Sequence, residues 1–333
     1  MPAEWEKHEA TWLSWPKDPL TFPESIIDGV ERIYVEMIQS LQKGEKIELL
    51  VDDQETEDRV SAMLSSKNNV RFHHIKSSDV WMRDYGPIFV RSNNNELAAT
   101  KWIFNAWGKK YDELLRDNVS GAEICEKTKF ALFEPGMVLE GGSIDVNGKG
   151  SCLTTRQCLL NKNRNHELDV KQIEDYLHDY LGVTNMIWLD EGIAGDDTDG
   201  HVDDIARFVN ETTVLCMLEQ DRNDENNAVL KRNYDLLKKS KGQDGRSLEV
   251  TTLNMPNKVE IEGTRLPASY ANFYIGNSAV LIPVFGDGKN DEKALSKISD
   301  LFPKKKTVGI NCRELVYGFG GIHCVTQQQP STG

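Results

Sequence analysis

DDTDGHVDDIARF, residues 196–208, carries the densest grouping of polar chemistry in this 333-residue sequence. Five aspartates and one histidine lie in it, directly before the apolar run IARFV (205–209). β-Branched and aromatic residues in such a run predict a strand. If residues 201–205 are extended, His201 and Asp203 share one face of the backbone. The segment therefore predicts polar side chains gathered where a strand begins, although a solvated acidic loop fits the same composition.

Three other segments have a similar layout, with glycines and charged or aromatic residues between apolar runs. They are VWMRDYGPIFV (80–90), LEGGSIDVNG (139–148) and GFGGIHCVTQQQP (318–330). The first two contain Asp84 and Glu140, which are candidate acids near strand ends. Asp84 fits equally well as a turn residue paired with Arg83. Active sites are often assembled on loops that a rigid sheet positions, so these segments are candidates for one site.

Cys324 is the candidate nucleophile because it follows a glycine cluster at residues 318–321. Glycines allow a substrate or a second backbone segment to approach closely. A reactive thiol needs a base or a cationic neighbour. His323 is adjacent, but neighbours on a strand point to opposite faces, so His201 is the better partner. A buried, inert cysteine is the alternative interpretation.

Short apolar runs alternate with stretches of helical periodicity along the chain. The predicted strands are residues 47–52, 70–75, 88–91, 97–104, 151–160, 185–189, 205–209, 212–218, 278–285 and 307–311. The predicted helices are residues 24–43, 54–66, 166–181, 223–240 and 290–301. This alternation predicts an α/β fold with mixed sheets, and the spacing of the helices is compatible with a repeated unit. No G-x-G-x-x-G motif opens a helix, which argues against a dinucleotide-binding repeat.

The charge balance points to small cations as partners. The sequence has 39 Lys and Arg against 53 Asp and Glu, a net charge of −14. A negative net charge disfavours binding to nucleic acid and to anionic lipid. No apolar run approaches the roughly 18 residues of a membrane span. The six cysteines include no C-x-x-C pair, and the N-terminus lacks a signal-peptide layout. We therefore expect cytosolic thiols, a cytoplasmic location, and no nucleic-acid or membrane partner.

The chain contains no linker and no long low-complexity stretch. We therefore expect one catalytic domain over residues 1–330, with a tail at residues 331–333. The last seven residues, QQQPSTG, are expected to fray.

The candidate residues share a chemistry suited to a planar cation. Carboxylates bind the N–H groups of a guanidinium in bidentate fashion, and tryptophan faces attract cations. A thiolate could attack the carbon of a guanidinium held in this way. The combination indicates an enzyme that acts on a guanidinium compound. A metal hydrolase that uses His201, Asp203 and Asp204 is an alternative, although H-x-D alone lacks the remaining ligands.

Six segments resemble, in order, the motifs of the agmatine deiminases of the bacterial peptidylarginine-deiminase type. They are MPAEWEKHEATWLSWP (1–16), VWMRDYGP (80–87), EGGSIDVNG (140–148), DDTDGHVDDIARF (196–208), SYANFYIGNSAVLIPVFG (269–286) and GGIHCVTQQQP (320–330). The resemblance covers nearly the whole chain. It implies a single-domain α/β pentein fold, a five-bladed propeller with pseudo-fivefold symmetry, of the superfamily that modifies guanidino groups. It implies neither a metal nor an organic cofactor.

The resemblance also implies roles for the candidate residues. It makes Cys324 the nucleophile and His201 the general acid and base, and Glu140 is the acid that works with the histidine. It makes Asp84 and Asp203 the carboxylates that hold the guanidinium nitrogens. The implied reaction hydrolyses agmatine to N-carbamoylputrescine and ammonia through a covalent amidino-thioether on the cysteine, in polyamine biosynthesis.

Three further residues are implied as parts of the substrate pocket. Trp81 is a pocket wall, Asn272 lines the pocket, and Asp197 lies where an acid could meet the distal amine of agmatine. Agmatine carries two positive charges and no carboxylate, so an acidic protein suits it. The expected partner is this small cationic substrate, and a homodimer is left open.

Two alternatives to an enzyme that hydrolyses agmatine stay open. Deimination of arginine in peptides needs the same chemistry, but with a pocket open to solvent and without a distal acid. A non-catalytic guanidine- or polyamine-binding protein would keep the carboxylates without the reaction. The presence of Cys324 and His201 argues against the second alternative.

Overall fold

Five sheets with the same strand pattern form the framework of the protein. The structure is a computed structural model and describes residues 1–333. In each of these sheets an antiparallel pair of strands is joined to a parallel pair, and helices connect the two parallel strands. The predicted α/β fold with mixed sheets is confirmed. The spacing of the helices reflects this repeated unit.

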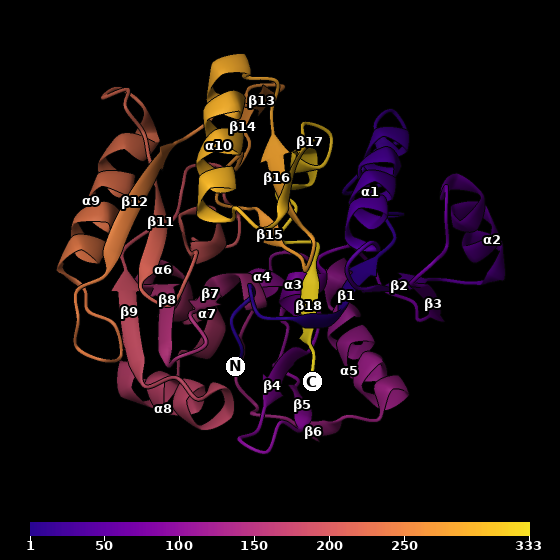
Figure 1. The fold of residues 1–333 in the computed structure, drawn as a ribbon, viewed down its shortest axis with the longest axis horizontal. Helices are drawn as coiled ribbons and strands as arrows, with labels where there is room; N and C mark the ends of the chain where they lie inside the picture. The colour runs from indigo at the N-terminus through magenta and orange to yellow at the C-terminus, as the bar shows by residue number, and fades with distance from the viewer.

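The first sheet joins the two ends of the chain. Its elements are β1 (His8–Ser14), α1 (Ile27–Leu41), β2 (Lys46–Val51), α2 (Gln54–Met63), β3 (Val70–His74) and β18 (Gln327–Pro330). β1 pairs antiparallel with β18 and parallel with β2, and Figure 1 shows the yellow C-terminal strand beside the indigo N-terminal one. The prediction that QQQPSTG frays is wrong for residues 327–330, because they are buried and paired as a strand.

The other four sheets have three strands each, and each forms a repeated unit with its neighbouring helices. The second unit contains α3 (Met82–Tyr85), β4 (Ile88–Arg91), β5 (Leu97–Thr100), α4 (Ala106–Lys109), α5 (Asp117–Thr128) and β6 (Ala131–Phe133). The third contains β7 (Ile144–Val146), β8 (Ser151–Thr155), α6 (Arg156–Leu159), α7 (Lys162–Asn165), α8 (Val170–Leu181) and β9 (Asn185–Leu189). The fourth contains β10 (Ala206–Phe208), β11 (Thr213–Leu218), α9 (Glu225–Lys239) and β12 (Glu249–Asn254). The fifth contains β15 (Tyr274–Ile275), β16 (Ala279–Val284), α10 (Gly288–Leu301) and β17 (Lys306–Asn311).

The remaining elements are one small hairpin and four 3-10 helices. The hairpin pairs β13 (Glu260–Ile261) with β14 (Thr264–Arg265). The 3-10 helices are η1 (Asp112–Leu114), η2 (Gly141–Ser143), η3 (Val202–Asp204) and η4 (Val316–Gly318). None of the helices is both long enough and apolar enough to cross a membrane.

Each of the ten predicted strands overlaps a strand of the structure, but two of them are predicted several residues too long. The strand predicted at 97–104 ends at Thr100, and the one predicted at 151–160 ends at Thr155. β8 ends at Thr155 because the Thr155 side chain accepts a hydrogen bond from the Cys158 backbone N–H and caps α6. Residues 201–205 are not extended, because 202–204 form η3.

The five predicted helices correspond to α1, α2, α8, α9 and α10, within four residues at either end. Their sequences carry clear signals, such as the capping box that Asp169 and Gln172 form at the start of α8. The helix α5 was not predicted because its apolar residues do not repeat along one face. It is fixed by packing instead, since Ile124 and Cys125 are buried in the main core.

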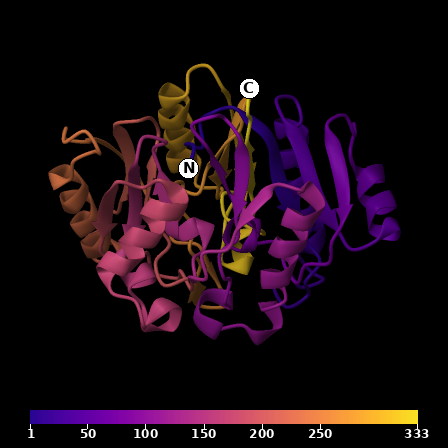
Figure 2. The same ribbon diagram turned by 90° about the horizontal axis from the view of Figure 1, so that it is seen from below.

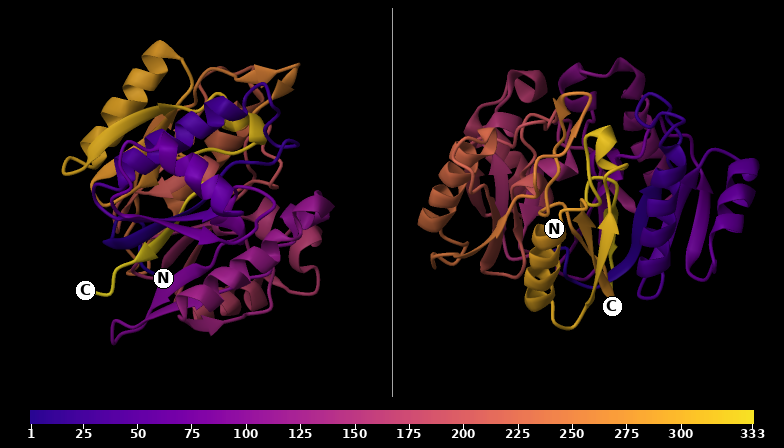
Figure 3. Two further views of the ribbon diagram at one scale, coloured as in Figure 1. Left: turned by 90° about the vertical axis from the view of Figure 1, so that its right-hand side faces the viewer. Right: turned by 90° about the horizontal axis from the view of Figure 1, so that it is seen from above.

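The core lies between the sheets and the long helices. One cluster contains 71 buried residues, and a second cluster of 13 lies mainly between α8 and the third sheet. The helices α1, α5, α8, α9 and α10 lie at the periphery, while short strands such as β7, β15 and β18 lie toward the middle (Figure 1). Figure 2 shows the same arrangement from below. Both ends of the chain lie on the same side of the molecule (Figure 3).

Candidate active site

The segments just before the short central strands carry the candidate residues. Asp84 lies four residues before β4, Glu140 four before β7, and Asp203 three before β10. Asn272 precedes β15 by two residues, and Cys324 precedes β18 by three. The five repeated units thus contribute side chains from equivalent positions. Strands that lie together toward the middle of the molecule bring together residues far apart in sequence.

Gly142 marks the point at which three of the predicted side chains converge. A Cβ atom at this position would lie 2.6 Å from His201 Nδ1, 2.9 Å from Asp84 Oδ1 and 3.2 Å from Asp203 Oδ2. No side chain larger than hydrogen fits there without displacing them. The backbone N–H of Gly142 donates a hydrogen bond to Asp84 Oδ1 over 3.0 Å. The second glycine of the sequence EGG therefore leaves room for the three side chains, and its backbone N–H is a hydrogen-bond donor to one of them.

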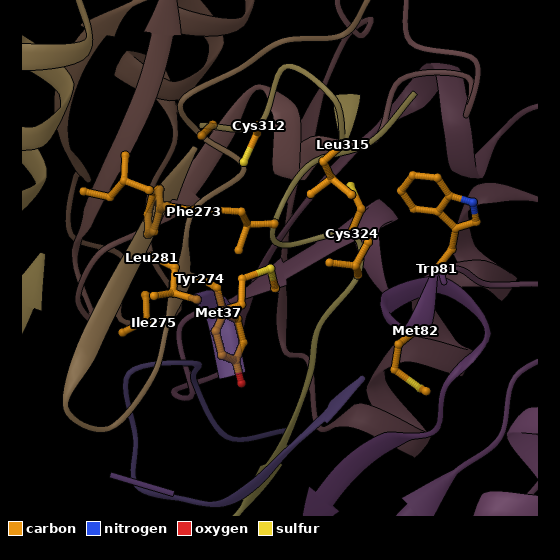
Figure 4. Packing of buried hydrophobic residues seen from close by; sticks show 14 of the residues in the cluster. Met37, Trp81, Met82, Phe273, Tyr274, Ile275, Leu281, Cys312, Leu315 and Cys324 are labelled. Carbon is orange, nitrogen blue, oxygen red and sulfur yellow. The ribbon is translucent and has the colours of Figure 1, made fainter. Parts of the chain in front are cut away.

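A cavity of about 340 Å³ opens onto the cluster. Its walls include Trp81, Asp84, Trp107, Asp197 and Cys324. Four carboxylates but no lysine or arginine line it. Figure 4 shows Cys324 among the buried residues of the main cluster, with the indole ring of Trp81 to its right. The cavity is therefore acidic and aromatic, with the thiol on its wall.

The thiol of Cys324 lies among polar side chains. Its Sγ is 3.1 Å from Asn272 Nδ2 and 3.6 Å from Asp203 Oδ2. Burial, together with the negative charges of Asp203, Asp204 and Asp84, raises the pKa of the Cys324 thiol well above its usual value. The thiol is consequently protonated at neutral pH when the cavity holds no cation.

Asn272 does not line the cavity, and instead contacts the thiol and the backbone of Cys324. Its Oδ1 accepts hydrogen bonds from the backbone N–H groups of His323 at 2.8 Å and Cys324 at 3.3 Å. Its Nδ2 donates to Asp204 Oδ1 over 2.9 Å. Asn272 therefore fixes the backbone turn that presents Cys324.

His201 is buried, and neither of its ring nitrogens has a hydrogen-bond partner. Its Nδ1 lies 3.8 Å from Asp84 Oδ1. Burial alone would lower the pKa of His201, but the negative charge of Asp84, the contact with the Cys158 thiol and the negative charge of Glu140 raise it well above the usual value. The ring therefore carries a proton at neutral pH, and its N–H groups are free to donate to a ligand.

The two aspartates next to the cavity differ in their hydrogen bonding. Asp84 Oδ2 accepts from Trp107 Nε1 over 2.9 Å, and burial raises the pKa of Asp84 to about 6 even though His201 acts to lower it. Asp203 Oδ2 lies 2.7 Å from His323 Nδ1, whereas its Oδ1 has no partner. Burial would raise the pKa of Asp203, but the hydrogen bond and charge of His323 lower it below its usual value. Both side chains are therefore ionised at neutral pH.

Glu140 is completely buried beside His201. Its Oε1 accepts a 2.7 Å hydrogen bond from Arg164 Nε, and its Oε2 has no partner. The structure also places Cys158 next to His201 and Glu140. The unpaired Oε2 is thus available to the imidazole or to a reacting group.

Glu140, Cys158 and His201 are also the residues that could hold a metal ion. Their ligand atoms lie within 4.8 Å of one another, and all three are buried. The alternative set of His201, Asp203 and Asp204 does not form such a group. Asp203 faces His323, and Asp204 accepts its hydrogen bond from Asn272.

Trp81 forms a cavity wall that the glycine cluster accommodates. Its Nε1 donates to Asp79 Oδ2 over 2.8 Å, which fixes the ring. A Cβ atom at position 320 would lie 2.2 Å from the ring, so Gly320 allows the indole to pack against the backbone near Cys324. At Gly320 the close approach is made by the Trp81 side chain, and not by the substrate or backbone segment that was predicted.

Asp197 lies on the cavity wall away from the buried cluster. Its Oδ2 accepts a 2.6 Å hydrogen bond from the Tyr111 hydroxyl. Burial raises the pKa of Asp197 to about 6, although the Tyr111 hydrogen bond opposes this. The carboxylate is therefore mostly ionised at neutral pH and adds negative charge to the wall.

Sequence reasoning missed four residues near the site: Glu4, Trp107, Cys158 and His323. His323 was set aside because neighbours on a strand face opposite ways. Residues 322–325 form a turn instead, and both His323 and Cys324 reach Asp203. The N-terminal motif MPAEW was a signal for Glu4, and the cavity tryptophan Trp107 had no motif to mark it.

The fold and the site together define a mixed α/β protein with a thiol, an imidazole and carboxylates beside an acidic cavity. Residues 1–330 match the family model of the Porphyromonas-type peptidyl-arginine deiminases, and the protein belongs to this family.

Relatives and solved structures of this kind match nearly the whole chain. An agmatine deiminase of Medicago truncatula is 37% identical, and the match covers 99% of this chain and 96% of the relative. The structure of the agmatine deiminase of Enterococcus faecalis gives a TM-score of 0.92 at 33% identity, covering 100% of this chain and 96% of the other. A C. jejuni agmatine deiminase with a cysteine-to-serine replacement and bound substrate gives 0.90 at 33% identity, covering 99% and 96%. An amidinotransferase from Microseira wollei shares the fold alone, with a TM-score of 0.56 at 11% identity.

Proposed function

We propose that this protein is an agmatine deiminase that hydrolyses the guanidinium group of agmatine to N-carbamoylputrescine and ammonia. The observation that carries the proposal is the position of the Cys324 thiol beside Asp203 and Asp84, on the wall of a cavity lined by carboxylates. Relatives that match the chain over its full length are named agmatine deiminases, which supports this substrate.

Asp84 and Asp203 are proposed to hold the guanidinium group. The unpaired Oδ1 of Asp203 can accept from one N–H, and Asp84 can accept from others. Such charge-assisted hydrogen bonds are among the stronger polar contacts in proteins. The ring of Trp81 supplies an aromatic wall for the cation. Held in this way, the guanidinium carbon faces the thiol.

The bound cation changes the protonation state of Cys324. Three carboxylates raise the pKa of the thiol in the empty cavity, and a guanidinium beside them offsets their charge. The thiol then loses its proton to solvent, and the thiolate attacks the guanidinium carbon. Binding and activation of the nucleophile are thus the same event.

His201 is proposed to move the protons of both chemical steps. The imidazolium protonates the departing amino group, so that ammonia leaves and a cationic amidino-thioether remains on Cys324. The neutral ring then takes a proton from water, and the resulting hydroxide adds to the same carbon. The thiolate is expelled, and the ureido product loses its remaining proton to solvent. Glu140 is proposed to stabilise the protonated ring through its unpaired Oε2.

The charge of the cavity favours an amine over a carboxylate at the distal end of the substrate. Asp197 and Glu262 line the cavity, and no lysine or arginine does. Free arginine would bring its carboxylate into this negative field, whereas the distal ammonium of agmatine would be attracted. We assign Asp197, held by Tyr111, to the distal amine.

We propose that the five sheets are the blades of a pentein propeller with pseudo-fivefold symmetry. The repeated strand pattern and the equivalent positions of the site residues support this arrangement. Residues 1–330 are proposed to act as one catalytic domain with a tail at 331–333. The six free cysteines accord with a cytoplasmic location.

The test compares agmatine, free arginine and an arginine-containing peptide as substrates, with ammonia and ureido product measured together. We expect turnover of agmatine only, and its complete loss in Cys324→Ala. Cys216→Ala is the matched control, because Cys216 is also buried but lies in the core away from the cavity. Turnover of the peptide instead would move the substrate to peptidyl-arginine, and a folded Cys324→Ala variant that keeps activity would refute the role of the thiol.

A further inference from the structure

His323 is buried directly behind the candidate nucleophile, between two carboxylates. Its Nδ1 lies 2.7 Å from Asp203 Oδ2, and its Nε2 lies 2.8 Å from Glu4 Oε2. The side chains of all three are at most 6% exposed. Glu4 comes from the other end of the chain, so this contact connects the N-terminal segment to the loop that carries Cys324.

The geometry determines the protonation state of His323. An ionised carboxylate only accepts hydrogen bonds, so a ring that contacts two of them must donate from both nitrogens. Only the imidazolium form has two N–H groups. Arg83 Nη2 at 3.3 Å and Arg207 Nη2 at 3.0 Å keep Glu4 ionised from its other sides. The pKa of Glu4 is well below its usual value, since the charges of Arg207, His323 and Arg83 outweigh burial.

The charges of the hydrogen-bonded network around His323 favour a protonated ring. The buried network contains three carboxylates and two guanidinium groups: Glu4, Asp145, Asp203, Arg83 and Arg207. A neutral His323 would leave one uncompensated negative charge in the interior, which is strongly unfavourable. The imidazolium brings the sum to zero.

We propose that Glu4 and His323 are positioning residues, in which Glu4 holds His323 as an imidazolium and His323 fixes Asp203 as an ionised carboxylate beside Cys324. The inference rests on the proposed deimination and deepens it. With its Oδ2 held by His323, Asp203 presents only its unpaired Oδ1 to the substrate cation.

The contact could instead serve only to anchor the N-terminus. Glu4 also accepts a hydrogen bond from the Ile275 backbone N–H over 2.8 Å, which ties this segment to β15. An anchor would affect stability but would not depend on the charge of His323. Protonation of His323 and the pH profile of the reaction therefore distinguish the two roles.

The first measurement uses the wild-type protein with ¹⁵N-labelled histidine. Long-range ¹H–¹⁵N spectra report whether each ring nitrogen carries a proton, and His323→Gln assigns the signals. We expect both ring nitrogens of His323 to carry a proton at pH 7, because each faces a carboxylate oxygen. A neutral tautomer at pH 7 would overturn the proposal. This measurement needs no substrate, so it is independent of whether the protein turns over agmatine.

The second measurement compares the pH dependence of kcat/KM for agmatine in Glu4→Gln and Glu6→Gln. Gln keeps the size of Glu4 but removes its charge, so His323 Nε2 loses an ionised acceptor and the ring should hold Asp203 less firmly. We expect kcat/KM to fall about tenfold or more in Glu4→Gln, with the loss growing toward alkaline pH. Glu6 lies in the same segment and pairs with Arg91, so Glu6→Gln should keep the wild-type profile. A folded Glu4→Gln variant with the wild-type profile would show that Glu4 is only an anchor.

Discussion

Cys324 is surrounded by negative charge, which is a poor setting for a nucleophilic thiol. Reactive cysteines generally gain from a cationic neighbour or a helix N-terminus. Here burial and the charges of Asp203, Asp204 and Asp84 act in the opposite direction. The positive charge that activates the thiol must therefore arrive with the substrate. In the empty state this keeps the thiol unreactive toward molecules other than a cation that fits the cavity.

A pH prediction follows from the raised pKa of Cys324. Below that pKa the thiolate fraction rises with pH, so alkylation of Cys324 by iodoacetamide should be slow near pH 7 and accelerate about tenfold per pH unit. The rate can be followed by mass spectrometry of the peptide that contains Cys324. Labelling of Cys216, which is buried away from the cavity, reports general opening of the protein. Fast labelling of Cys324 that does not vary with pH would contradict this description of the site.

At the scale of elements, the site is built from the short segments that precede the central strands. The 3-10 helices η2 and η3 lie against each other, and Gly142 in η2 faces His201, Asp84 and Asp203. The motifs alone predicted that these segments carry the polar residues. They did not predict the helical turn at 202–204 or the turn at 322–325, because tertiary contacts with Asn272 and Asp203 decide those conformations.

Gly142→Ala tests this arrangement of elements. The added methyl would lie 2.6 Å from His201 Nδ1 and displace it together with the two aspartates. A displacement of about 1 Å at a reacting centre can cost about a hundredfold in rate, so we expect a loss of that size in kcat/KM. The free energy of unfolding should fall by about 1–3 kcal/mol, as for other overpacked sites.

Gly242→Ala is the matched control for this substitution. Gly242 is also buried, but the nearest atom to a Cβ there is 3.5 Å away, an ordinary contact. We expect its kcat/KM and its free energy of unfolding to stay near wild type. Gly142→Ala enzyme with unchanged activity would mean that the three side chains do not need their present positions.

At the scale of the whole molecule, the pairing of β1 with β18 brings the last catalytic loop beside the first residues of the chain. Local sequence patterns could not reveal this pairing, because it joins segments more than 300 residues apart. β7, β10 and β15 contain only two or three residues, too few to show periodicity. The long helices and the longer strands were predictable, and four of the polar loops were candidates for one site, whereas the part played by Asn272 was implied only by the family resemblance.

The negative charge of the molecule also matters at this scale. The net charge of −14 surrounds a cavity whose charged lining residues are all acidic. Such a field attracts a dication and accelerates its encounter with the site, and salt screens this effect. The negative charge of the whole chain thus favours the same dicationic substrate as the acidic lining of the cavity.

The most direct test of the account is to trap the covalent intermediate on Cys324. Wild-type and His201→Gln protein would each be mixed with agmatine, quenched in acid at a series of times and digested for mass spectrometry. His201→Gln should slow both the formation and the hydrolysis of the adduct, because the ring serves both steps. We predict that the peptide containing Cys324 gains the mass of agmatine less one ammonia, and that Cys324→Ala and the peptide containing Cys216 gain nothing. Wild-type enzyme that turns over agmatine, with no adduct on Cys324 in either protein at any quench time, would contradict the proposed thiol chemistry.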